Sequence, residues 1–203
     1  MIKKIVITGG LGYIGTELCK IYSGYSWYHK IIVIDNRFVS ERVNQIRNWN
    51  MEFIHGDILD KDFVKKIFND ADVVHHLAGI TDVPRTKTES TDSRDNKIKS
   101  VGEEGTQNII DAINDKCKII FPSTHVIYEG IEQVKNDILE DEEPKPTLSY
   151  SSSKVTNEKQ LKDSGKNFVI LRLGSVYGYS SDTARIDIMP NLFSKITSQN
   201  GTL

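Results

Sequence analysis

The sequence predicts a doubly wound α/β fold built on a parallel sheet, and three observations support this prediction. Short runs rich in β-branched residues alternate with stretches that have apolar residues at helical spacing, which is typical of parallel strands joined by crossover helices. The strand-like runs show little polar alternation, as in a sheet covered on both faces. A glycine-rich turn follows the first of these runs. We therefore expect right-handed crossovers, with ligands bound at the carboxyl ends of the strands.

The first half of the chain begins this alternation. The run KKIVIT at residues 3–8 is the first predicted strand, and residues 12–23 have the spacing of the first helix. Further strands are predicted at 30–35 (KIIVID), 51–57 (MEFIHGD) and 71–79 (ADVVHHLAG), with a helix at 60–69.

The second half continues with longer helices. One helix is predicted at 100–115, and another at 149–165, where Gly165 ends it. Strands are predicted at 116–124 (KCKIIFPST) and 167–174 (NFVILRLG), and residues 186–203 are expected to form a helix and then the start of a strand.

Two long polar stretches, residues 80–97 and 129–146, interrupt the rhythm. Both follow the carboxyl ends of predicted strands. Each individual charged residue in them is best explained as solvated surface. As whole segments, however, loops of this length are more often functional than short ones.

Composition excludes several classes of function. The net charge is −2 over 203 residues, so no surface for a polyanion is indicated and nucleic acid is not an expected partner. No apolar run approaches the roughly 18 residues that cross a bilayer, and the chain opens on a strand rather than a signal peptide. We therefore expect a cytoplasmic protein without membrane contact, in which Cys19 and Cys117 are reduced structural thiols.

The stretch TGGLGYIG at residues 8–15 carries the first functional signal. Gly10, Gly12 and Gly15 have the spacing G-x-G-x-x-G, and Gly9 precedes them. Such glycines permit a tight turn and a close approach of the backbone to a pyrophosphate, which lies over the free N–H groups of a helix N-terminus. Because the turn lies between a predicted strand and a predicted helix, it indicates a dinucleotide site and hence a Rossmann fold.

Acidic residues after the next two strands support this site. Asp35 lies at the end of the second strand, 20 residues after Gly15. A carboxylate there accepts hydrogen bonds from the adenosine ribose and repels a 2′-phosphate, so NAD is favoured over NADP, although Arg37 is close enough to leave NADP open. Asp57 follows the third strand and either reaches the adenine edge or serves as a turn or capping residue.

The sequence YSSSK places Tyr150 and Lys154 four residues apart, on one face of a predicted helix. A tyrosine ionises near pH 10, and a neighbouring ammonium together with an oxidised nicotinamide would favour its phenolate. The fifth predicted strand ends in Ser123 and Thr124, which offer a hydroxyl for the reacting oxygen. These residues predict an acid/base pair beside the cofactor.

Together these motifs resemble the extended short-chain dehydrogenase/reductase family, which contains NAD-dependent sugar-nucleotide epimerases and dehydratases. The matching stretches occur in the family's order and cover nearly the whole chain: TGGLGYIG (8–15), VIDN (33–36), GDI (56–58), HLAG (76–79), EGTQNII (104–110), STHVIY (123–128), YSSSK (150–154) and LRLGSVYG (171–178).

The resemblance implies a role for each matched position. The catalytic residues are Thr124, Tyr150 and Lys154. The implied cofactor-binding residues are Gly9, Gly12, Tyr13, Ile14, Gly15, Asp35, Asn36, Asp57, Ile58, Leu77, Ala78, Gly79, Lys154, Gly174 and Val176. The implied substrate-binding residues are Ser123, Thr124, His125 and Ser175.

Some positions depart from the family pattern. Gly102 and Ser175 stand where the family usually has asparagine. His125 and Val126 replace the Asp-Glu pair of the dehydratases, which disfavours 4,6-dehydration. His125 is either an alternative acid/base, since its pKa is near neutral, or a strand-exit histidine bonded to a loop. His75 and His76 are adjacent in a strand and face opposite sides, so no metal site is expected.

Members of the family continue for roughly another hundred residues, the size of a small second domain. Residues 1–178 are therefore expected to form the NAD-binding domain with the catalytic residues, and residues 179–203 to begin a substrate domain that looks truncated. Exposed apolar surface is expected where such a domain would pack. The resemblance also implies a homodimer through the helices at 100–115 and 149–164.

The predicted function is that of an NAD-dependent sugar-nucleotide epimerase. In that reaction Tyr150 removes a proton from a sugar hydroxyl, and hydride moves to and from the nicotinamide. A net reductase, dehydrogenase or dehydratase of a nucleotide sugar is the nearest alternative. A dinucleotide-binding scaffold or sensor without catalysis is the alternative from another class.

Overall fold

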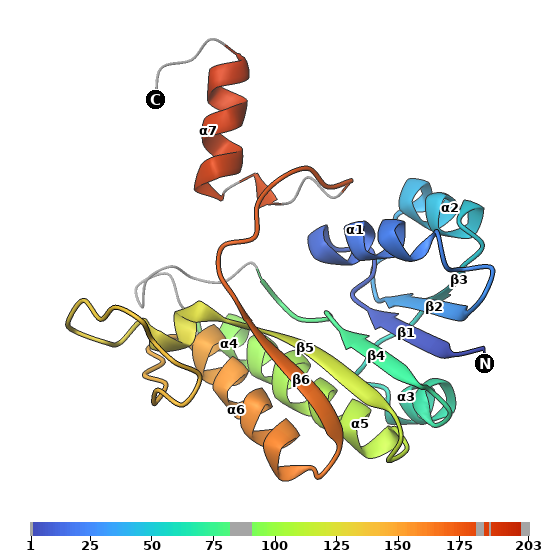
Figure 1. The fold of residues 1–203 in the computed structure, drawn as a ribbon, viewed down its shortest axis with the longest axis horizontal. Coiled ribbons are helices and arrows are strands. Elements are labelled where there is room, and N and C mark those ends of the chain that lie inside the picture. The colour runs from blue at the N-terminus through green and yellow to red at the C-terminus, as the bar shows by residue number, and fades with distance from the viewer. Residues whose placement is uncertain (1, 82–90, 182–184, 187, 200–203) are drawn as a thin grey trace.

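A single parallel sheet forms the centre of the protein in a computed structural model that describes residues 2–81, 91–181, 185, 186 and 188–199. Its strand order is β3-β2-β1-β4-β5-β6 (Figure 1). Every neighbouring pair is parallel, which confirms the predicted doubly wound fold. The strands are β1 (Lys4–Thr8), β2 (Lys30–Asp35), β3 (Glu52–His55), β4 (Val73–His76), β5 (Lys118–Thr124) and β6 (Asn167–Leu173).

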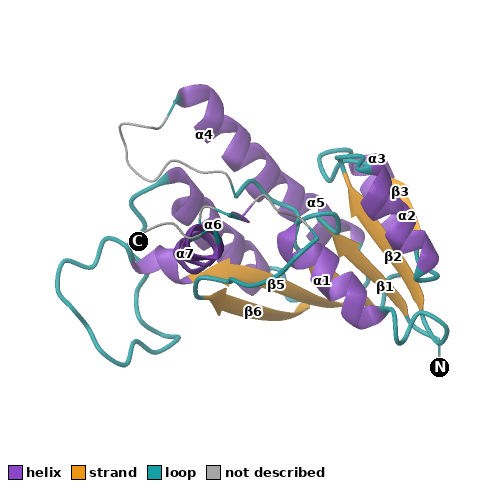
Figure 2. Ribbon diagram, turned by 90° about the horizontal axis from the view of Figure 1, so that it is seen from above, coloured by secondary structure: helices purple, strands orange, loops and turns teal. Residues whose placement is uncertain are grey.

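Helices connect the strands and lie on both sides of the sheet (Figure 2). They are α1 (Tyr13–Tyr22), α2 (Ser40–Asn48), α3 (Lys61–Phe68), α4 (Asp92–Lys99), α5 (Gly105–Ala112), α6 (Ser149–Asp163) and α7 (Met189–Ser198). A π-helical turn, η2 (Ser100–Glu104), joins α4 to α5, and a 3₁₀ helix, η3 (His125–Tyr128), follows β5.

Alternate residues of the strands supply two separate cores, as expected of a sheet covered on both faces. In β1, Val6 packs into the core beneath α3 and α5, together with Phe68 and Ile109. Ile5 and Ile7 pack into the opposite core, which α1 and α2 cover.

Adjacent His75 and His76 follow the same rule and point to opposite faces of the sheet. The His75 Nε2 bonds the hydroxyl of Tyr22 in α1 at 2.7 Å, while the His76 Nε2 bonds the hydroxyl of Thr106 in α5 at 2.9 Å. The two imidazoles therefore belong to different layers, as the sequence predicts.

Two helices lie where the sequence predicts none. Residues 37–50 carry no prediction, yet α2 forms there and buries Val43 and Ile46. The stretch 80–97 is predicted to be a loop, and this is wrong for its last part, because α4 begins at Asp92 with the Thr91 hydroxyl as its cap. The predicted helix 100–115 is therefore the second part of a longer helical run that ends at Ala112. Residues 82–90 lie outside the described residues.

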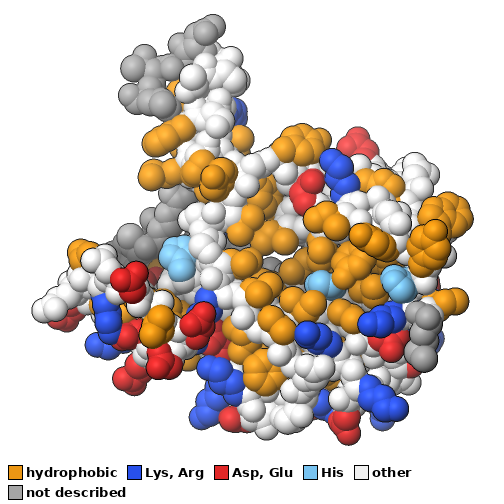
Figure 3. Space-filling view, in the orientation of Figure 1, with side chains coloured by type: hydrophobic (Ala, Val, Ile, Leu, Met, Phe, Trp, Pro, Cys, Tyr) orange, Lys and Arg blue, Asp and Glu red, His pale blue; other side chains and the backbone are white. Residues whose placement is uncertain are grey.

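The chain beyond β6 leaves the sheet and leads to α7, which stands away from the body at the top of Figure 1. None of the described α7 side chains is buried, and Figure 3 shows apolar side chains on this projection. This matches the predicted apolar exposure. The large apolar side chains exposed beyond β6 are Val176, Tyr177, Tyr179, Ile186, Met189, Leu192 and Phe193.

The predicted strand start at 200–203 lies outside the described residues. Within the described part of the chain, no helix is long and apolar enough to cross a bilayer.

Candidate active site

The turn between β1 and α1 is packed so closely that only glycine fits at several positions. Gly9 has a φ of +64°, and a Cβ there would lie 2.8 Å from the Ala78 backbone nitrogen. A Cβ on Gly15 would overlap the Gly9 carbonyl oxygen and lie 2.7 Å from the Gly10 Cα. The backbone thus curls tightly at the N-terminus of α1, where unpaired N–H groups favour a phosphate. This cradle fits the pyrophosphate of a dinucleotide.

Asp35 fixes the shape of this turn from the end of β2. Its Oδ2 accepts a hydrogen bond from the Leu11 N–H at 3.0 Å, and its Oδ1 accepts from the Arg37 N–H at 3.0 Å and from the Arg37 side chain at 3.3 Å. The carboxylate is buried. It therefore stabilises the turn, in addition to its predicted role in ribose binding. Asp35, which is predicted to favour NAD, forms an ion pair with Arg37, the residue that leaves NADP open.

The residues predicted around the adenine behave differently from one another. Asn36 is exposed and donates to the Asp57 carboxylate at 3.2 Å. Asp57 also accepts from the Leu59 N–H at 3.0 Å, which is the turn role left open by the sequence. Ile58 is buried in the core against Gly105, where a Cβ would lie 2.5 Å from its Cδ1. The side chain of Ile58 is therefore used for packing.

A column of hydrogen bonds runs from the residues after β4 to α5. The Ala78 N–H donates to the Thr8 hydroxyl at 3.0 Å, Thr8 bonds the His76 Nδ1 at 3.0 Å, and the His76 Nε2 bonds the Thr106 hydroxyl at 2.9 Å. Burial, helped by the positive charge of Lys154, lowers the pKa of His76 to about 3. His76 is thus a neutral strut that holds Ala78 against Gly9.

Glu129 sets the start of the catalytic helix. Its Oε1 accepts from the Thr147 N–H at 2.8 Å and from the Leu148 N–H at 2.9 Å, and the Ser151 hydroxyl also donates to it. These bonds satisfy groups near the N-terminus of α6, which otherwise lack helical partners. The helix therefore begins at Ser149 and places Tyr150 in its first turn.

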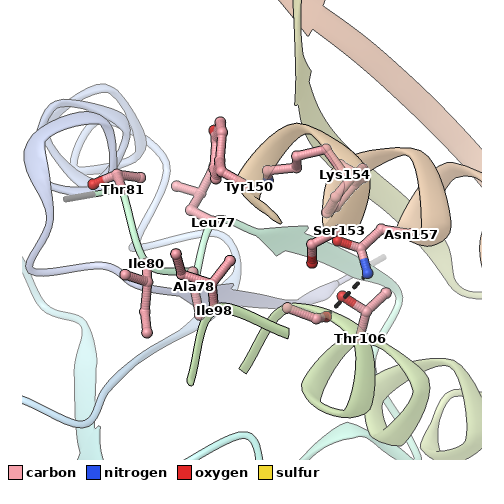
Figure 4. Close-up of a pocket in the computed structure, with 13 residues that line it drawn as sticks. Leu77, Ala78, Ile80, Thr81, Ile98, Thr106, Tyr150, Ser153, Lys154 and Asn157 are labelled. Atoms are coloured by element: carbon pink, nitrogen blue, oxygen red, sulfur yellow. Dashed lines mark hydrogen bonds between the residues drawn. The ribbon is translucent and has the colours of Figure 1, made fainter. Parts of the chain in front are cut away.

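Tyr150 and Lys154 line a pocket with Leu77, Ala78 and Thr81 (Figure 4). Gly79 lines the same pocket. The structure therefore brings the two predicted catalytic side chains against the residues that lie beside the glycine turn. Tyr150 is partly buried and lines the pocket, so the ring is not sealed in the core.

The pKa of Tyr150 is raised above its usual value, because burial outweighs the positive charge of Arg185 and a side-chain hydrogen bond with Thr124, which both lower it. The sequence predicts a phenolate favoured by the Lys154 ammonium together with an oxidised nicotinamide. The Lys154 Nζ donates to the Pro122 carbonyl at 2.8 Å and lies 5.8 Å from the centre of the Tyr150 ring.

Lys154 is itself held in an unusual environment. Its Nζ lies 4.4 Å above the Phe121 ring. Burial lowers the pKa of Lys154 to about 8, although the charge of Glu158 acts in the opposite direction. An amine with such a pKa exchanges protons near neutral pH, which suits a group that returns a proton to a neighbouring acid/base residue such as Tyr150.

A buried ionic network joins α6 to β5 and β6. Arg172 of β6 donates to the Glu158 carboxylate from its Nε at 3.0 Å and its Nη2 at 2.7 Å, and the Ser123 hydroxyl donates to the same carboxylate at 2.7 Å. Burial alone would raise the pKa of Glu158, but Arg172 and Ser123 lower it below its usual value. Ser123, predicted to bind substrate, is therefore bonded inside this network. Glu158 is not among the residues predicted from the sequence, although it stands four residues after Lys154 on the same helix.

Several predicted positions lie at the carboxyl ends of β5 and β6. Thr124 is buried at the end of β5 and caps η3, where its hydroxyl accepts from the Val126 N–H at 3.3 Å. His125 is exposed and its Nδ1 bonds the carbonyl of Leu173, the last residue of β6, at 3.1 Å. The predicted rim residues after β6, namely Gly174, Ser175 and Val176, are all exposed.

The position of Gly102 has a physical explanation. A Cβ there would overlap the Ser153 hydroxyl of α6, and the Gly102 carbonyl accepts from the Asn157 side chain at 3.0 Å. Glycine thus lets η2 approach α6 closely beside the pocket. π-Helical turns are frequent at functional sites.

One protein family matches nearly the whole chain, including the glycine turn and the Tyr150–Lys154 pair. The family model described as "NAD dependent epimerase/dehydratase family" matches residues 5–201. The chain belongs to this family. The family's own description names NAD, in agreement with the predicted cofactor.

Several curated members of the family resemble the chain. dTDP-D-glucose 4,6-dehydratase of Dictyostelium discoideum is 31% identical over 198 residues, covering 87% of this chain and 44% of the relative. CDP-paratose 2-epimerase of Salmonella typhi is 30% identical over 203 residues, covering 86% of this chain and 58% of the relative. UDP-glucose 4-epimerase of Neisseria meningitidis serogroup C is 31% identical over 174 residues, covering 79% and 48%. The chain thus spans about half the length of these relatives.

Solved structures of family members share the fold. UDP-N-acetylglucosamine 4-epimerase from Methanobrevibacter ruminantium M1 superposes with a TM-score of 0.77 at 27% identity. UDP-glucuronic acid 4-epimerase from Bacillus cereus, solved as a tyrosine-to-phenylalanine mutant with NAD and a fluorinated UDP-glucuronic acid, gives 0.80 at 25% identity. In both cases the match covers 98% of this chain and 64% of the other.

Proposed function

We propose that the protein is an NAD-dependent sugar-nucleotide enzyme of the epimerase type. The observation that carries this proposal is the pocket lined by Tyr150, Lys154, Leu77 and Ala78. It brings an acid/base pair against the backbone that closes the glycine turn. The epimerases among the relatives and the solved structures support the same reaction class.

The residues of the chain divide the work between binding and proton transfer. The glycine turn and the N-terminus of α1 would hold the pyrophosphate, and Asp35 the adenosine ribose. NAD bound there supplies a reversible hydride acceptor, so that a sugar carbon can be oxidised and then reduced from its other face. NAD rather than NADP remains the choice because the Asp35 carboxylate already neutralises part of the Arg37 charge.

Tyr150 would take the proton of the sugar hydroxyl and return it at the end of the cycle. Thr124, which shares a hydrogen bond with the Tyr150 side chain, would hold the same sugar oxygen. Lys154 would restore the proton balance of the phenol, since its pKa of about 8 lies close to neutral pH. The positive nicotinamide ring of the oxidised cofactor would offset the burial that raises the pKa of Tyr150.

Residues 1–178 and 179–203 are proposed as the cofactor domain and the start of a substrate region. His125 and Ser175 are proposed to face the sugar, because both are exposed at the rim of the catalytic side. A homodimer is proposed through α5 and α6, whose outer surface carries Gln107 and Lys159 beside a shallow groove. The cytoplasm is proposed as the location.

A panel of nucleotide sugars tests the proposal, with product stereochemistry and NADH absorbance recorded together. An epimerase inverts one carbon with only catalytic amounts of NAD and no lasting NADH signal. A stoichiometric change in NADH would establish the net reductase or dehydrogenase instead, and loss of water from the sugar would establish a dehydratase. NAD binding without turnover of any sugar would favour the scaffold.

A further inference from the structure

The chain returns to the glycine turn after it has left the sheet. Tyr13, the first residue of α1, donates its hydroxyl proton to the Gly178 carbonyl. The Asn191 side chain donates to the Tyr13 hydroxyl at 2.9 Å, and the Ser180 hydroxyl donates to the Tyr13 carbonyl at 2.8 Å. Segments far apart in the sequence are therefore joined through one tyrosine. We name Tyr13, Gly178, Ser180 and Asn191 the Tyr13–Asn191 latch.

Asn191 is the centre of this latch. Its Oδ1 accepts from the Gly178 N–H at 2.9 Å, and its Nδ2 donates both to Tyr13 and, at 3.0 Å, to the Arg185 carbonyl. Gly178 has a φ of +120°, a conformation that glycine adopts readily and other residues rarely. The latch thus ties the Gly178 N–H and the Arg185 carbonyl to one side chain, that of Asn191.

Arg185 lies at the mouth of the catalytic pocket. Its Nη1 donates to the Thr81 carbonyl at 3.0 Å, and Thr81 lines the pocket together with Tyr150. The charge of Arg185 lowers the pKa of Tyr150, against the larger effect of burial. Arg185 is therefore bonded to the part of the pocket lining that Thr81 shares with Tyr150, although no motif of the sequence marks it.

The groups around the Tyr150–Lys154 pair come from four parts of the chain. α6 supplies Lys154, whose ammonium is directed to a backbone carbonyl, and β5 supplies the Thr124 hydroxyl. β4 supplies His76, which is neutral because its pKa is lowered to about 3. The segment after β6 supplies Arg185. Among these groups, Arg185 is the cation whose charge lowers the pKa of Tyr150.

We propose that the Tyr13 hydroxyl and the Asn191 carboxamide are positioning residues that hold Arg185 beside Tyr150, and that Arg185 is a second cation for the catalytic phenol. This arrangement connects the cofactor turn to the acid/base group through the segment that enters the substrate region. Its catalytic meaning rests on the proposed function, whereas the placement of Arg185 is tested without any substrate.

Titration of Tyr150 in protein labelled with ¹³Cζ-tyrosine tests the Arg185 half of the proposal. The Tyr150→Phe spectrum assigns the resonance, and no NAD or sugar is added. Arg185→Gln is expected to raise the midpoint of Tyr150 by roughly 1 pH unit, the lower end of the effect of a neighbouring opposite charge. Arg185→Lys is expected to retain most of the wild-type midpoint because it keeps the charge. An unchanged midpoint in Arg185→Gln overturns the proposal.

Tyr13→Phe and Asn191→Ala test the latch half. Both are expected to raise the Tyr150 midpoint in the direction of Arg185→Gln but by less. They are also expected to speed amide exchange in residues 176–181 and 189–198 by about tenfold, which corresponds to about one net hydrogen bond. Tyr177→Phe is the matched control, since Tyr177 is 66% exposed on the same segment. If Tyr13→Phe matches Tyr177→Phe in both measurements, the latch is overturned.

These outcomes are independent of the epimerase assignment. A protein that converts no nucleotide sugar but shows the expected shifts would retain the latch and lose the proposed function. If the protein epimerises a sugar but the Arg185 variants leave the Tyr150 midpoint unshifted, the proposed function is retained and the role of Arg185 is lost.

Discussion

Two regions that flank the candidate active site, here named the cofactor wall and the catalytic wall, are built by different physical means. The cofactor wall, from Gly9 to Gly15, is backbone packed on backbone, and an added Cβ at Gly9 would come 2.8 Å from the Ala78 nitrogen. The catalytic wall, formed by α6, β5 and β6, depends on buried charges, with the Glu158 and Arg172 side chains only 3% and 15% exposed. The first wall is rigid because nothing larger fits, and the second because its charges satisfy one another.

This difference explains what each wall tolerates. A packed glycine turn responds to added volume, whereas an ionic network responds to the removal of one partner, which leaves a buried charge without compensation. His76 connects the two walls, because it bonds Thr8 beside the turn and its pKa is lowered by the Lys154 charge in addition to burial.

The largest expected effect is on the catalytic wall. Glu158→Ala is predicted to lower the free energy of unfolding by about 3–5 kcal/mol, because Arg172 and Ser123 both lose their buried acceptor. Urea denaturation measures this. Lys162→Ala is the matched control, since its ion pair with Glu158 is 3.6 Å long and its side chain is 55% exposed, and it should cost under about 1 kcal/mol. Equal losses in the two variants would show that the buried network adds no stability beyond a surface ion pair.

The next effect is on the cofactor wall. Gly15→Ala is predicted to distort the turn at a cost of about 1–3 kcal/mol, which weakens NAD binding by roughly 10- to 100-fold. Calorimetric titration with NAD measures the change. Gly24→Ala serves as control because a Cβ there would lie 3.8 Å from its nearest neighbour, the Ile21 carbonyl. Wild-type NAD affinity in Gly15→Ala would contradict the cradle.

The third effect concerns the strut between the walls and develops only below about pH 6.5, where the unfolded chain begins to bind the His76 proton. Since the pKa of His76 is lowered from 6.5 to about 3 in the folded protein, the unfolded chain binds the proton first as the pH falls. Stability is therefore predicted to decrease from about pH 6.5 toward pH 3, at up to about 1.4 kcal/mol per pH unit. His76→Gln should flatten this slope, and exposed His125→Gln should leave it unchanged. An identical slope in wild type and His76→Gln would refute the neutral strut.

The sequence predicts most of the sheet because buried parallel strands are nearly continuous apolar runs, and β2 lies at the predicted residues 30–35. It misses α2 and α4 because each buries little, with Ile98 the buried residue of α4 and a mainly polar sequence in α2. Weak burial leaves little periodicity to detect.

The candidate site divides in the same way. The glycine turn and the Tyr150–Lys154 pair are local spacings, so the sequence shows them directly. The bonds of Arg172 to Glu158, or of Asn191 to Tyr13, join different elements of the fold, and only the three-dimensional arrangement reveals them. The sequence also predicts that the Lys154 ammonium favours the phenolate of Tyr150. In the structure this ammonium donates to the Pro122 carbonyl, and burial lowers the pKa of Lys154.

The most direct test of the proposed chemistry is a paired measurement of NAD affinity and sugar-nucleotide turnover in Tyr150→Phe. Removal of the hydroxyl is predicted to lower turnover by about 10²- to 10⁴-fold, the range for a lost general acid/base, with NAD affinity close to that of the wild type because the glycine turn is untouched. Wild-type turnover in this variant would contradict the account.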